Sequence, residues 1–239
     1  MTRFTKLIAR LAKEYGEPKP LPAQGPFELV MWENACYLLP DDRRAMVFDL
    51  LRTQVGMSAR AIAAASDEVL LPLAKLGGMR PEVRVFRWRE IARITLTQFG
   101  GNLDQILQGS VKDAKKALKG FPNIGDPGAE KILTLCGMTV GLPLESNGLR
   151  VLVRVGYGRE QKDYGRMYRS TQEALEPEVP RTAEACSRAF VLLREHGKEI
   201  CKTNEPHCFR CPVLDLCGYP RKNMLEPPER KSLRANPAG

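Results

Sequence analysis

The chain has little that would place it in a membrane or outside the cell. Of its 239 residues 43% are hydrophobic, yet no run approaches the ~20 apolar residues of a membrane-spanning helix. The opening residues, MTRFTKLIARLAKEYG, are basic but lack the apolar core and small-residue cleavage site of a signal peptide. The sequence therefore predicts a cytoplasmic protein without membrane contact, long enough to bury a core in one large domain or two small ones.

Strand signals are nearly absent as well, and there are no internal repeats. Apolar residues recur instead at helical spacing, as in Phe4, Leu7 and Leu11. The pattern predicts an all-α protein, with helices that include 26–39, 41–54, 80–101, 110–120, 128–139, 148–156, 165–176 and 181–199. Residues 219–239 are rich in proline and charge, and we expect them to form a basic, disordered tail.

Acidic residues are fewer than basic ones. The chain has 37 Lys and Arg against 28 Asp and Glu, a net charge of +9. Such an excess favours a polyanionic partner, most simply nucleic acid. A basic surface without a partner explains the charge equally well, so the charge alone does not identify a nucleic-acid-binding protein.

Four cysteines stand close together near the end of the chain. Six, two and five residues separate Cys201, Cys208, Cys211 and Cys217. In a reducing cytosol such clustered thiols indicate a metal rather than disulfides. Zinc and an iron–sulfur cluster both remain open on local chemistry alone. The other three cysteines, at positions 36, 136 and 186, lie in apolar helical segments and are expected to be core residues.

The centre of the chain, LKGFPNIGDPGAEKIL, predicts two helices joined by a tight hairpin. The first helix ends at Lys119 and Gly120, and Asp126 and Pro127 begin the next. Backbone N–H groups of such a turn and helix N-terminus can hold a phosphate. Asn123 is one of the few residues besides glycine that tolerate a positive φ. The alternative is an ordinary connection between helices.

Together these features resemble the endonuclease III branch of the helix-hairpin-helix DNA glycosylases, from about Phe4 to Cys217. The resemblance implies a 4Fe–4S cluster bound by Cys201, Cys208, Cys211 and Cys217. It implies a six-helix domain at 26–140, with the helix-hairpin-helix motif at about 110–139, and a cluster-bearing domain formed by 1–25 and 141–218. It also implies a cleft that bends double-stranded DNA and accepts a flipped nucleotide. We expect the protein to be a monomer, associated with a bacterial nucleoid.

The resemblance also predicts DNA-binding residues. Leu38 stands where the family has a glutamine that fills the space left by the flipped nucleotide, and it can act as an apolar wedge. Arg210, between two of the cysteines, suits phosphate contact. The remaining predicted DNA contacts are the hairpin residues Phe121, Pro122, Asn123, Ile124 and Gly125.

Two catalytic positions depart from the family pattern. Pro127 occupies the place of the lysine that attacks the sugar in bifunctional members, so the usual Schiff-base lyase step is not open to this chain. Lys131, one turn further on, is a weaker candidate whose alternative role is phosphate contact or solvation. Glu145 stands at the position of the family aspartate. It can stabilise a positively charged sugar or activate a water, or it is merely a cap before the next helix.

Glu33 and Tyr37 are four residues apart in the predicted helix 26–39, on one face of it. They are candidates for lining a base pocket. The alternative is a structural hydrogen bond that satisfies Glu33, donated by Tyr37 or by a backbone N–H.

The sequence is compatible with three functions. The first is a DNA glycosylase of base-excision repair that lacks the lysine-dependent lyase step. The second is a protein of the same fold that has lost catalysis and recognises damaged or distorted DNA. The third, a zinc-bound helical interaction module, explains the cysteines but leaves the hairpin unexplained.

Overall fold

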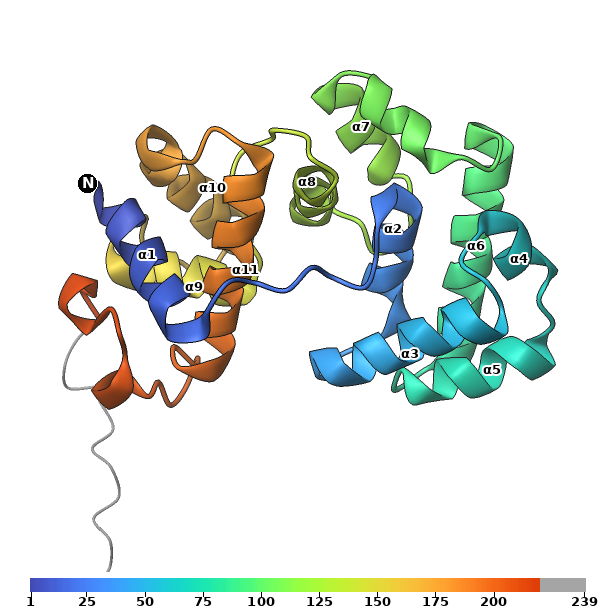
Figure 1. Ribbon diagram of the computed structural model, residues 1–239, viewed down its shortest axis with the longest axis horizontal. Coiled ribbons are helices and arrows are strands. Elements are labelled where there is room, and N and C mark those ends of the chain that lie inside the picture. Colours follow the sequence, from blue (N-terminus) through green and yellow to red (C-terminus); the bar gives the residue numbers. More distant parts are fainter. Residues whose placement is uncertain (220–239) are drawn as a thin grey trace, which may run out of the picture. The chain divides into compact units, whose positions relative to one another are not determined.

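The computed structural model describes residues 1–219, all helix and connecting loop without a strand, which confirms the predicted all-α class (Figure 1). Of the expected tail at 219–239, residues 220–239 lie outside these described residues. None of the described helices is both long and apolar enough to cross a membrane. The described part of the chain therefore consists of helices that pack on one another.

The chain divides into two compact units. The smaller consists of Met1–Pro18, Leu144–Glu178 and Phe190–Gly239, and the larger of Lys19–Pro143 and Val179–Ala189. The division assigns Val179–Ala189, together with 19–25 and 141–143, to the larger unit, whereas the sequence predicted these three segments in the cluster-bearing domain. The long helix α11 (Ala183–Glu199) contributes residues to both units.

The smaller unit is built from helices that are apolar on one face. In α1 (Arg3–Tyr15) the hydroxyl of Thr2 accepts the N–H of Thr5, and Gly16 ends the helix at a φ of 76°. Leu7 and Leu11 of α1 are fully buried. The other elements of this unit are α9 (Ser146–Val155), α10 (Tyr164–Leu175), the second part of α11, and the short 3-10 turns η2 (Glu176–Glu178), η3 (Cys208–Arg210) and η4 (Leu214–Leu216).

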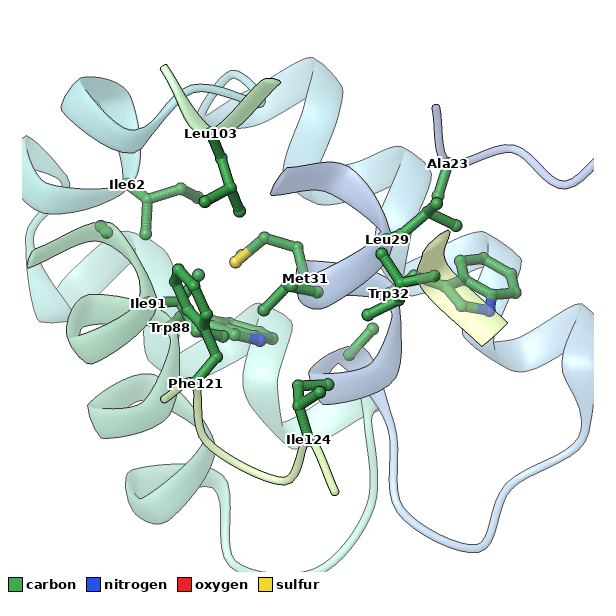
Figure 2. Packing of buried hydrophobic residues seen from close by; sticks show 14 of the residues in the cluster. Ala23, Leu29, Met31, Trp32, Ile62, Trp88, Ile91, Leu103, Phe121 and Ile124 are labelled. Atoms are coloured by element: carbon green, nitrogen blue, oxygen red, sulfur yellow. The ribbon is translucent and has the colours of Figure 1, made fainter. Parts of the chain in front are cut away.

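The larger unit surrounds one central helix, α2 (Gly25–Ala35). Its residues Leu29, Val30, Met31 and Trp32 are all buried, as expected for a helix that is apolar on every side (Figure 2). The indole of Trp88 is fully buried in the same core. The other elements of the larger unit are α3 (Asp41–Gln54), α4 (Ala59–Ala64), α5 (Asp67–Leu76), α6 (Pro81–Phe99), η1 (Leu103–Gln108), α7 (Val111–Leu118) and α8 (Asp126–Leu135). Of these, α3, α6, α8 and η1 contact α2 directly.

The predicted helix at 26–39 is wrong at its end, because α2 stops at Ala35. The N–H of Tyr37 bonds to the carbonyl of Gly77, 3.1 Å away, instead of continuing the helix. Leu38 has a φ of 53°, and Leu39 precedes Pro40, which disfavours helical backbone. Tyr37 therefore lies outside the helix and does not share a helical face with Glu33.

Candidate metal centre and nucleic-acid interface

The predicted hairpin is present between α7 and α8. Gly125 is the N-cap of α8 and has no side chain to accept the first N–H groups of the helix. Such N–H groups have no partner within the helix, and together with the helix dipole they attract anions. Gly125 itself is exposed. The start of α8 is therefore a chemically suitable site for a phosphate.

A buried asparagine from α2 holds the hairpin turn. Asn123 has a φ of 60°, and its Nδ2 donates to Asn34 Oδ1 at 2.9 Å. Asn34 Nδ2 donates in turn to the carbonyl oxygens of Pro122 and Val30, each at 3.0 Å. Asn34 is only 3% exposed. The sequence analysis missed this role, although a lone asparagine inside an apolar helix must find partners.

Two of the predicted DNA-binding side chains lie in the core. Phe121 and Ile124 are 3% and 6% exposed, and both point into the packed cluster (Figure 2). Phe121 also stacks on Phe99, with ring centroids 6.1 Å apart. These two residues can offer DNA only their backbone, whereas Asn123 and Gly125 are exposed and Pro122 is half-buried.

Lysines flank the hairpin but are already paired with carboxylates. Lys119 Nζ lies 3.0 Å from Asp126 Oδ2, and Lys115 Nζ lies 2.5 Å from Glu130 Oε1. Hydrogen bonding from Lys119 lowers the pKa of the Asp126 carboxyl. A phosphate at the start of α8 would therefore compete with Asp126 for the same cations.

Lys131 and Glu33 form an ion pair between α8 and α2. Their side chains are 17% and 19% exposed. Tyr37, which the sequence analysis considered as a partner of Glu33, is 54% exposed and lies beyond the helix end. The structure thus satisfies Glu33 through Lys131.

An exposed surface follows the end of α2, and we call it the Leu38 surface. It consists of Leu38 and the pocket-lining residues Tyr37, Met79, Arg80, Val83, Arg84 and Arg87. The pocket has a volume of about 350 Å³. Leu38 is 81% exposed and Met79 is 71% exposed. Arg80, like Leu38, has a positive φ, of 57°, and such backbone conformations cluster at functional sites.

Glu145 is the N-cap of α9. Its Oε1 accepts the N–H of Gly148 at 2.7 Å, and its Oε2 accepts the Asn147 side-chain amide at 2.8 Å. The capping role weighed in the sequence analysis is therefore observed. The carboxylate is half-buried and held in one orientation by these two bonds.

The four clustered cysteines line one pocket of the smaller unit. Apolar residues such as Val151, Ile200 and Val213 share its wall. Cys36, Cys136 and Cys186 belong to the larger unit. Within residues 1–219 no three His, Cys, Asp or Glu side chains are grouped closely enough to hold a metal ion.

Arginines of α9 hold the cysteine loop, a role that the sequence analysis missed. Arg154 Nη1 donates to Cys201 Sγ at 3.3 Å and to the carbonyl of Lys202 at 2.7 Å. Its guanidinium also lies 4.2 Å from the ring centroid of Tyr219. Arg150 Nε donates to the carbonyl of Cys201 at 2.7 Å. Arg210, predicted to contact phosphate, is exposed.

Burial governs the ionisation of the groups in this pocket. It raises the pKa of the Cys208 and Cys217 thiols, and that of Cys211 to about 12. Burial also lowers the pKa of His196 to about 4. A bound cation would reverse the effect on the thiols, because a coordinating thiol loses its proton.

Comparison with known proteins finds that the chain is similar to DNA glycosylases. No family model matches the chain. It is 26% identical over 229 residues to a thymine/uracil-DNA glycosylase of Pyrobaculum aerophilum. This alignment covers 92% of this chain and 93% of that protein. It is 26% identical over 169 residues to endonuclease III of Thermotoga maritima, over 71% and 72% of the two chains.

A solved structure agrees with these relatives. The non-covalent endonuclease III–DNA complex superposes with a TM-score of 0.72 at 18% identity, over 93% of this chain and 97% of that one. The comparisons confirm the predicted resemblance to the endonuclease III-like helix-hairpin-helix DNA glycosylases and their fold.

Proposed function

We propose that this chain, similar in sequence and fold to the endonuclease III-like glycosylases, binds double-stranded DNA and excises a base without a lysine-dependent lyase step. The start of α8 carries the proposal: its N–H groups have no side-chain cap, and Asn34 holds the turn that presents them. Similarity over nearly the whole length of a thymine/uracil-DNA glycosylase supports it.

The DNA interface includes the hairpin and the Leu38 surface, which both adjoin the C-terminal end of α2. The hairpin would hold the backbone through its N–H groups, without reading sequence. Leu38 would enter the base stack as an apolar wedge. The guanidinium groups of Arg80 and Arg87 would neutralise nearby phosphates.

Glu145 is the proposed catalytic carboxylate. Its two hydrogen bonds fix its orientation before any substrate binds, which is the condition for electrostatic stabilisation of a developing positive charge. Pro127 supplies no amine, and Lys131 is already engaged by Glu33. Glu33, which is also half-buried, remains the candidate for lining the base pocket.

Excision is tested on duplexes that contain uracil, thymine opposite guanine, or other damaged bases, each with and without alkali after incubation. We expect strand breaks only after alkali, and no product that borohydride traps. Glu145→Gln keeps the shape and removes the charge, so it should nearly abolish excision. Breaks without alkali would contradict the absence of a lyase step.

The alternative is a protein of this fold that binds distorted DNA without catalysis. One observation favours it: both oxygens of Glu145 already serve the cap of α9. It predicts tight binding to mismatched or abasic duplexes, and no excision from any of them.

We further propose that the cysteine pocket holds a 4Fe–4S cluster. A zinc ion needs four ligands about 2.3 Å from one point, whereas a cluster takes one thiolate at each iron and so holds its thiolates further apart. Four thiols around one largely apolar pocket fit the second arrangement. N–H donors also reach two of the sulfurs, from Arg154 to Cys201 and from Tyr219 to Cys217. When bound, the cluster would order a loop that has little core of its own.

A further inference from the structure

His196 connects the N-terminal helix to the cysteine loop. Its ring lies on α11 and is only 1% exposed. Nδ1 lies 2.9 Å from the hydroxyl of Tyr15, at the end of α1. Nε2 lies 3.5 Å from Cys211 Sγ. One buried imidazole therefore has a partner on each nitrogen, and one of these partners is a sulfur proposed to bind the cluster.

The direction of both bonds follows from the chemistry of that sulfur. A metal-bound cysteine has lost its proton, so its sulfur can only accept a hydrogen bond. Nε2 must then carry the hydrogen. In a neutral imidazole the other nitrogen is an acceptor, so the hydroxyl of Tyr15 donates to Nδ1. The three groups form a directed chain from Tyr15 through His196 to Cys211.

The packing around the ring fixes its orientation. The rings of Tyr15 and His196 meet at 60°, with centroids 6.0 Å apart. Leu11, one turn before Tyr15, is fully buried and anchors α1 in the core. A buried ring with both nitrogens engaged cannot turn without losing two hydrogen bonds at once.

We propose that Tyr15 and His196 are positioning residues, which keep a hydrogen bond on the Cys211 thiolate and thereby raise the reduction potential of the cluster. The inference rests on the proposed 4Fe–4S cluster. Hydrogen bonds to the sulfurs are among the factors that set such potentials, because an N–H dipole offsets the negative charge gained on reduction. Outer partners also orient the ligand itself.

The test compares iron-loaded wild type, His196→Phe and Tyr15→Phe by voltammetry. We expect His196→Phe to have the most negative potential, because it loses the bond to sulfur. Tyr15→Phe removes one hydroxyl and keeps the ring packing, so its potential should shift less, in the same direction, with iron content unchanged. Tyr164→Phe, in the same unit, is the matched control and should leave the potential at its wild-type value.

A spectroscopic measurement on the wild type makes the test independent of whether His196→Phe folds. In protein with 15N-labelled histidine, pulsed EPR of the reduced cluster should detect a 15N coupling from the imidazole that donates to Cys211, which Tyr15→Phe retains. A loaded wild type without that coupling, or a loaded Tyr15→Phe with wild-type potential, would overturn the inference. A wild type that binds no iron would refute the cluster itself. These outcomes are separate from DNA binding and excision, which test the proposed function.

Discussion

The hairpin of the larger unit and the cysteine loop of the smaller unit are both short irregular segments, but they are held in different ways. The hairpin inserts Phe121 and Ile124 into the core and bonds its turn to Asn34. The cysteine loop buries few apolar side chains and is held by arginine bonds to its carbonyls and sulfur. The hairpin therefore carries its own anchor, whereas the loop would gain its anchor from the proposed cluster.

The comparison indicates which of the two segments would be stabilised by a bound cofactor. A segment anchored by apolar packing gains from burial of its side chains. In a segment whose thiols act as thiolate ligands, the negative charge is costly to bury until a cation neutralises it. The raised pKa of Cys211, about 12, expresses that cost. If the proposed cluster binds, its binding and the folding of the loop are coupled, whereas the hairpin folds without it.

The largest effect is expected from removing one cluster ligand. Cys208→Ala should abolish iron binding and the absorbance near 400 nm and give poorly soluble protein, because ligation and loop folding are coupled. Iron content and the absorption spectrum of purified protein measure this. Cys136→Ala, in the larger unit, is the control and should keep both. Stoichiometric zinc without iron in anaerobically purified wild type would reject the cluster.

The next effect concerns the anchor of the hairpin. Asn34→Ala leaves the carbonyl of Pro122 without its donor, which should cost about 1–3 kcal/mol of unfolding free energy. Urea denaturation measures the loss, and iron content should not change. Asn204→Ala, at an exposed position in the smaller unit, should leave stability within ~0.5 kcal/mol. If Asn34→Ala lost iron as well, the two anchors would not be independent.

The sequence predicted most helices because their signals are local. Helix formation is favoured by features within one or two turns, such as the capping residues Ser110 and Thr2 and the apolar face of α1. The end of α2 could not be predicted, because the N–H of Tyr37 pairs with a carbonyl 40 positions away, at Gly77. The turn conformation of Asn123 was predicted from its residue type, and its φ of 60° confirms it.

The candidate site was predicted less completely, because many of its contacts join residues that are far apart in the sequence. The cysteines and the hairpin are visible as motifs, and Glu145 as a cap followed from its place before a helix. The partners Asn34, Lys131 and Arg154 act across long sequence distances, which periodicity does not encode. The sequence analysis could not tell which hairpin side chains face the core, since a five-residue turn has no period.

A smaller effect, confined to DNA binding, is expected at Gly125. A Cβ there would meet only Pro127, at 3.9 Å, and the φ of −95° suits any residue. Gly125→Val should therefore fold normally, while its branched side chain covers the N–H groups at the start of α8. Affinity should fall by a similar factor for all duplexes, since no base is read there. Fluorescence anisotropy with several duplexes measures this, and a loss specific to one lesion would contradict it.

The smallest effect is expected at Asp126, which distinguishes charge from anchoring within the hairpin. Asp126→Asn removes an exposed ion pair with Lys119, worth at most ~1 kcal/mol of stability. Because the folded pKa of Asp126 is lowered, its contribution is present above the unfolded pKa of about 3.9 and is lost as pH falls through the lower folded value. Below this pH range the stability of the variant should equal that of wild type.

The affinity of the Asp126→Asn variant for DNA should rise, since Lys119 becomes free to meet a phosphate. The slope of log affinity against log salt should steepen by up to ~0.9, the value for one added phosphate contact. An affinity lower than wild type would mean that Asp126 orders the hairpin and does not compete with DNA.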